Sequence, residues 1–103
     1  MGSLRKKQSE FARSAALLIN YAVGKGYEVT FGDAFATSGH IKNSFHYKRL
    51  AIDLNLFKDG VYLTSTEDHR SLGEYWEAIG GSWGGRWDDG NHYSWGESDR
   101  SKI

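Results

Sequence analysis

The stretch that decides the fold is Ser44-Phe-His-Tyr-Lys-Arg-Leu-Ala-Ile-Asp53. Its second half opens a run in which apolar residues alternate with others: Leu50, Ile52, Leu54 and Leu56 against Ala51, Asp53 and Asn55. A period of two is typical of a β-strand with one buried face, so Asp53 is predicted on the less apolar face. His46 lies seven residues earlier, where a loop can bring it over that face. An imidazole and a carboxylate placed together in this way are typical metal ligands.

A third candidate ligand lies near the end of the chain, in Asp89-Gly-Asn-His92. Catalytic zinc sites use three protein ligands and leave one position for water. His46, Asp53 and His92 fit that ligand set, and Asp89 fits the general base that takes the proton of the water. If His92 opens a final strand, it faces the same cleft as Asp53. The residues alone leave a plainer alternative, in which the histidines are structural and Asp53 caps a turn or pairs with a neighbouring cation.

Composition narrows the classes of function. The 103 residues predict one domain, with the last residues, 97–103, as a frayed tail, and we expect a monomer. The 13 basic and 13 acidic residues balance, which argues against nucleic acid or a membrane surface as partner. With no cysteine, disulfides and thiolate zinc sites are excluded. The N-terminal stretch has no signal-peptide core, so we expect synthesis in the cytoplasm.

The order of elements predicts an α+β domain, with two main helices packed on a small antiparallel sheet and a zinc site in a cleft on that sheet. Apolar spacing predicts a first helix capped by Ser3 and a second one whose buried side carries Leu72, Trp76 and Ile79. His69, in the first turns of that second helix, is expected to be solvated. The expected segments are a helix over 4–23, a strand over 27–31, a loop over 33–43, a strand over 50–57, a hairpin turn over 58–60 with a return strand over 61–63, a helix from 64 to 79 and a last strand within 82–95.

Several motifs in the right order resemble the zinc peptidases that cut peptidoglycan stem peptides. They are Ser44-x-His46-x6-Asp53, then Trp83-Gly-Gly-Arg-Trp87 followed by Asp89-x-x-His92. That family includes D-Ala-D-Ala carboxypeptidases, vancomycin-resistance D-Ala-D-Ala dipeptidases and phage L-alanyl-D-glutamate endopeptidases, and the compact phage and prophage members are the most similar. The resemblance implies one zinc ion, a peptidoglycan peptide as substrate, and a lytic enzyme that reaches the cell wall of a phage host after release. It implies His46, Asp53 and His92 as zinc ligands, Asp89 as general base and Ser44 as a substrate contact.

One departure from the family pattern bears on activity. Ala36 stands where the family usually has an arginine that holds substrate or the oxyanion, and loss of such a cation removes several kcal/mol of transition-state stabilisation. Lys42, Arg49 or Arg86 are the candidates to replace it. The alternatives are therefore a zinc-containing peptidoglycan-binding module with weakened catalysis, and an interaction domain with a purely structural zinc site.

Overall fold

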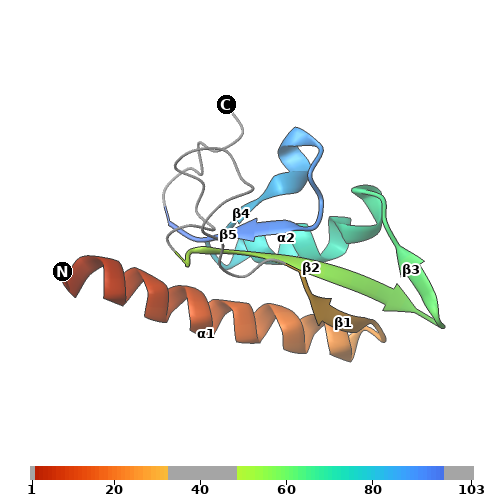
Figure 1. Cartoon of the computed structure of the whole chain (residues 1–103), viewed down its shortest axis with the longest axis horizontal. Helices are drawn as coiled ribbons and strands as arrows, with labels where there is room; N and C mark the ends of the chain where they lie inside the picture. Colours follow the sequence, from red (N-terminus) through yellow and green to blue (C-terminus); the bar gives the residue numbers. More distant parts are fainter. Residues whose placement is uncertain (1, 33–48, 97–103) are drawn as a thin grey trace.

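The computed structural model describes residues 2–32 and 49–96, which form two α-helices and five strands (Figure 1). Their bounds in chain order are α1 (Gly2–Gly24), β1 (Glu28–Phe31), β2 (Ala51–Lys58), β3 (Val61–Leu63), the 3-10 turn η2 (Glu67–His69), α2 (Arg70–Ala78), β4 (Ser82–Trp83), the 3-10 turn η3 (Gly84–Trp87) and β5 (His92–Ser94). The predicted α+β class, with two helices and a small antiparallel sheet, is confirmed.

The sheet is built around β2, its longest strand, in the order β1-β2-β5-β4. β1 pairs along one edge of β2. On the opposite edge β5 pairs with Ala51–Asp53, and β3 pairs further along with Leu56–Lys58. Leu54 and Asn55 therefore lie at a break in that edge, between the ends of two separate partner strands.

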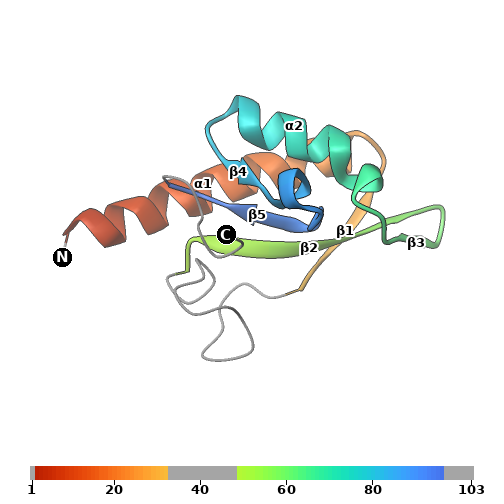
Figure 2. The same cartoon turned by 90° about the horizontal axis from the view of Figure 1, so that it is seen from above.

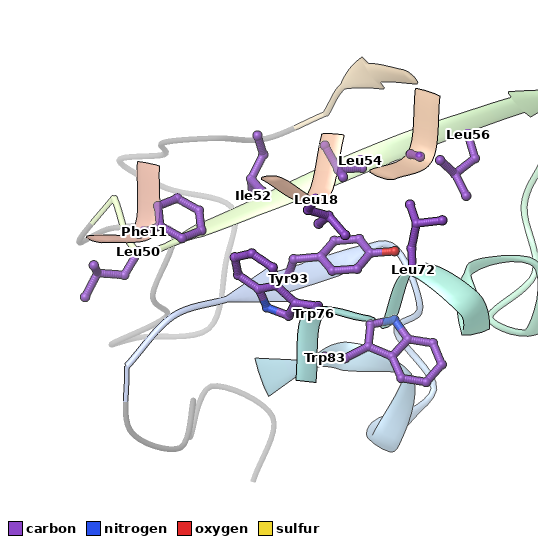
Figure 3. Packing of buried hydrophobic residues seen from close by; sticks show 11 residues of the cluster. Phe11, Leu18, Leu50, Ile52, Leu54, Leu56, Leu72, Trp76, Trp83 and Tyr93 are labelled. Carbon is purple, nitrogen blue, oxygen red and sulfur yellow. The ribbon is translucent and has the colours of Figure 1, made fainter. Parts of the chain in front are cut away.

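The core lies between the sheet and the two helices, which sit side by side on one side of β2 (Figure 2). The predicted alternation of β2 is correct, because Leu50, Ile52, Leu54 and Leu56 all enter the core. Helix α1 contributes Phe11, whose ring meets the Trp76 ring of α2 edge-on at 6.1 Å. Trp76 and Tyr93 fill the centre of the core (Figure 3). Asp53 and Asn55 therefore lie on the sheet face opposite the core.

Local backbone geometry explains where the elements end. The hairpin between β2 and β3 turns at Asp59 and Gly60, which both have positive φ (52° and 79°), as in the tight turns that suit the twist of a hairpin. The predicted cap at Ser3 is wrong, because α1 already includes that residue. The second helix begins with a 3-10 turn, and the last segment contains two short strands, β4 and β5, rather than one.

Two predicted features, the loop over 33–43 and the frayed tail over 97–103, lie outside the described residues. Within the described part of the chain, no helix is long and apolar enough to span a membrane.

Candidate active site

Two of the predicted ligands lie side by side on neighbouring strands. Asp53 of β2 and His92 of β5 are directly opposite each other in the antiparallel pairing. His92 Nδ1 lies 3.5 Å from Asp53 Oδ1, and the two side chains are 4% and 21% exposed. Two atoms bound to one tetrahedral zinc ion at ~2.0–2.1 Å are ~3.4 Å apart. The separation of these two donor atoms therefore fits a shared metal ion.

The structure does not describe every member of the predicted site. Ser44 and His46 lie outside the described residues, and among those described no group of three potential metal ligands occurs. The structure therefore brings together two of the three predicted ligands, Asp53 and His92.

The turn that carries Asp89 into β5 is held by short backbone contacts. Asp89 N donates to Gly84 O (2.9 Å), and His92 N donates to Asp89 O (3.1 Å). The buried indole of Trp83 donates to Gly90 O (2.7 Å). A Cβ on Gly84 would lie 2.2 Å from Asp89 O and 2.8 Å from His92 Cβ, so only glycine permits this close approach. These contacts fix the backbone of Asp89 relative to that of His92.

Trp87, at the end of η3, lies over the second ligand candidate. Its ring centroid is 6.0 Å from that of His92. Its Nε1 is buried and has no hydrogen-bond partner among the described residues. Trp87 is therefore a wall of the site, whereas Trp83 is 1% exposed and belongs to the core.

A pocket of about 190 Å³ opens at the break in the edge of β2. We call it the hairpin pocket; its lining includes Asn55, Tyr62, Thr66, His69, Asp89 and Asn91. The β2–β3 hairpin forms one wall, where Tyr62 Oη donates to Asn55 Oδ1 (3.4 Å). The opposite wall is the turn before β5, where Gly90 N donates to Thr66 Oγ1 (3.1 Å). Because Asp89 lines it, this pocket adjoins the predicted general base.

His69 lines the hairpin pocket, in an environment that the sequence pattern did not predict. The sequence predicts a solvated side chain, but His69 is 2% exposed, and its Nδ1 lies 2.7 Å from the hydroxyl oxygen of Tyr93. Burial lowers the pKa of His69 to about 4, and the nearby carboxylates of Asp68 and Asp89 only partly oppose that shift. Burial likewise raises the pKa of Tyr93 well above its usual value. Both side chains are therefore neutral at pH 7. Since Tyr93 follows 24 residues later, no local pattern links the two.

Arg86, one of the candidates to replace the missing family arginine, already pairs with a carboxylate. Arg86 Nη2 and Nε contact the two carboxylate oxygens of Glu77 at 2.6 and 2.8 Å. This pair lowers the pKa of Glu77 and raises that of Arg86. Because the guanidinium ties η3 to α2, Arg86 is poorly placed to bind substrate.

A known protein family matches the part of the chain that carries the candidate site. The family described as D-alanyl-D-alanine carboxypeptidase matches residues 37–95, which is more than half of the 103-residue chain. The chain belongs to this peptidase family. No individually curated protein matches the sequence.

The family match covers the strands that carry Asp53 and His92, the turn with Asp89, and the positions of Ser44 and His46. It excludes α1 and β1, which supply one layer of the core and one edge of the sheet. The D-alanyl-D-alanine carboxypeptidase family therefore accounts for the part of the chain that bears the candidate active site.

Proposed function

We propose that the protein is a zinc-dependent peptidase that hydrolyses peptidoglycan stem peptides, with residues 1–103 acting as a single catalytic domain. The observation that carries this proposal is the Asp53–His92 pair, whose donor atoms are 3.5 Å apart on adjacent strands. A paired carboxylate and imidazole, with a further carboxylate three residues before the imidazole, is a donor set suited to metal-assisted hydrolysis. Membership of a peptidase family supports the same reaction class.

In this proposal Asp53, His92 and His46 hold the ion, and the strand pairing fixes the first two before the metal arrives. Zinc, when bound, lowers the pKa of a water molecule and polarises the carbonyl of the scissile bond. Burial of His92 keeps competing water away from its ring. The ring of Trp87 restricts the orientations of the His92 imidazole.

Asp89 moves the proton. Its carboxylate accepts a proton from the attacking water and delivers it to the amine of the leaving group, so that cleavage yields a neutral amine. Gly84 and Trp83 hold the turn and thereby limit how far this carboxylate can move from His92. Ser44 is proposed as a substrate contact.

For the substrate, we place an L-alanyl-D-glutamate bond first and a D-Ala-D-Ala bond second, on the resemblance to compact phage enzymes. The biological role that follows is lysis of a phage host, after release of the enzyme to the cell wall. The test is controlled expression inside a bacterium. Lysis is expected only when the inner membrane is permeabilised, and an absence of lysis after permeabilisation counts against the role.

The decisive experiment is mass spectrometry of purified muropeptides incubated with the zinc-loaded protein. We expect one stem-peptide bond to be cut, and the masses of the fragments name that bond. Asp89→Asn should abolish the cut, since the amide cannot take up the proton. Asp59→Asn is the matched control, because the same change falls in the exposed hairpin turn, where asparagine tolerates positive φ.

Ala36 and the Glu77–Arg86 pair favour one alternative, a zinc-containing binding module with weakened catalysis. Muropeptides that bind the zinc-loaded protein and remain uncut would establish that alternative. A purely structural zinc site predicts a different pattern, in which Asp89→Asn changes nothing and His46→Ala unfolds the protein.

A further inference from the structure

The hairpin pocket holds a buried imidazole that the proposed chemistry does not use. His69 is 98% removed from solvent, and its Nδ1 is engaged by Tyr93. No hydrogen bond to its second nitrogen, Nε2, forms within the described residues. Nε2 is also not one of the buried, unpartnered polar atoms of this part of the chain, which are Ser71 Oγ and Trp87 Nε1. Because Tyr93 engages Nδ1 and His69 lines the hairpin pocket, Nε2 is the ring nitrogen that remains for an occupant of that pocket.

The buried tyrosine decides which nitrogen carries the proton. The hydroxyl of Tyr93 is fully buried, and among the described residues His69 is its one hydrogen-bond partner. If Tyr93 donates to Nδ1, the hydroxyl is satisfied and the neutral ring carries its proton on Nε2. The opposite tautomer leaves the buried O–H without an acceptor, which is costly. Tyr93 therefore holds His69 as a donor toward the pocket.

The size and charge of the pocket restrict what that donor binds. About 190 Å³ is less than the ~300–1,000 Å³ of a whole-ligand site and suits one residue of a longer molecule. The described lining includes no lysine or arginine, and Asp89 adds negative charge beside the neutral ring. A free carboxylate is disfavoured there, whereas an uncharged carbonyl oxygen accepts from Nε2 without an electrostatic penalty.

We propose that the hairpin pocket is the subsite for an internal residue of the peptide substrate beside the scissile bond, and that His69 Nε2–H donates to the carbonyl oxygen of that residue. This inference rests on the proposed function for the identity of the substrate, because Asp89 borders both the pocket and the catalytic turn. His69 is a specificity-determining residue, and Tyr93 is a positioning residue that acts through it.

The first test observes His69 directly, by NMR of the imidazole nitrogens in the zinc-loaded protein of 103 residues. The free protein is expected to show the tautomer with the proton on Nε2, and Tyr93→Phe is expected to populate both tautomers. Tyr75→Phe is the control, since it removes a hydroxyl from a ring stacked on Tyr21, in the helix layer. A wild-type ring protonated on Nδ1 overturns the proposal.

The second test adds substrate. Asp89→Asn is titrated with a synthetic stem peptide that contains both the L-alanyl-D-glutamate and the D-Ala-D-Ala bonds. Saturation is expected to shift the Nε2 resonance of His69. Unchanged nitrogen resonances at saturation, or no binding of the peptide, overturn the proposal. A shift in a protein whose wild type never cuts the peptide rejects the peptidase function but keeps the subsite, so the two failures are distinguishable.

Kinetics provide the third test. His69→Phe is expected to raise KM about tenfold and to change kcat by less than about twofold, because the contact is made equally in ground and transition states. An unchanged KM in a folded His69→Phe variant contradicts the proposal. If this variant does not fold, Tyr93→Phe decides the question, since it keeps the His69 ring. Tyr93→Phe is expected to raise KM about threefold, because part of the population then has the wrong tautomer of His69.

Discussion

At the scale of single residues, the burial of His69 makes stability depend on pH. In the unfolded chain its imidazole takes up a proton below its ordinary pKa of 6.5, whereas in the folded protein it stays neutral down to about 4. The unfolded state therefore binds more protons between those values, and the free energy of unfolding falls as pH drops through this window, by ~1.4 kcal/mol per unit. The free energy of unfolding of the metal-free protein, measured in urea, is expected to be about 2 kcal/mol lower at pH 5 than at pH 7 because of this group.

His69→Phe isolates the contribution of that histidine, because every other titrating group is shared with the wild type. The pH profile of the variant should be flatter over the same interval. Parallel profiles for the two proteins would mean that His69 takes up its proton as easily in the folded state as in the unfolded chain.

Gly84 tests the turn before β5. Gly84→Ala places a methyl group 2.2 Å from Asp89 O and 2.8 Å from His92 Cβ, so the turn must shift. Such overpacking costs ~1–3 kcal/mol, and here it also displaces the proposed base relative to His92. We expect loss of stability in denaturant together with a fall in kcat. Gly24→Ala is the control, since nothing lies within 4 Å of its added methyl group, and it should be neutral or slightly stabilising.

At the scale of elements, Trp76 joins α2 to both short strands. Its Nε1 lies within hydrogen-bond distance of Ser82 O (3.1 Å) and Ser94 O (2.9 Å), and the ring is fully buried. Trp76→Phe removes this donor and leaves a void, so we expect a loss of ~2–4 kcal/mol in the free energy of unfolding. Tyr75→Phe, one position earlier on α2, keeps its ring stacked at 4.2 Å on Tyr21 and should cost less than ~1 kcal/mol.

The strands also show which features a sequence pattern can predict and which it cannot. The alternation of Leu50 to Leu56 depends only on period two, so the strand and its buried face were predictable. A final strand opened by His92 predicted only that His92 faces the same cleft as Asp53, and the register that sets the two residues directly opposite each other comes from the pairing of β5 with β2. The environment of His69 could not be predicted, because its burial depends on Tyr93, which reaches it only after β5 pairs with β2. The hairpin pocket was missed for the same reason, since it depends on where two partner strands stop along one edge.

At the scale of the whole molecule, metal binding should stabilise the fold. A ligand that binds only the folded state adds RT ln(1 + [L]/Kd), or ~2.7 kcal/mol at a hundredfold excess over Kd. Thermal unfolding with and without zinc should therefore show a rise in Tm for the wild type. Asp53→Asn should lose most of that rise, and Asp59→Asn should retain it. A rise that survives Asp53→Asn would place the bound zinc elsewhere.

The strand order has a consequence for the newly made chain. β5 is the last described strand to be synthesised, yet it lies inside the sheet, between β2 and β4. A nascent chain that has emerged only as far as α2 presents Asp53 on an unpaired strand edge, without its imidazole partner. Such an edge can pair with other chains, so the interval before β5 docks is when this protein is most prone to aggregate. The strand that ends this interval also carries His92, the second of the proposed ligands, so under the proposed function the chain becomes able to bind metal only when the open strand edge has been covered.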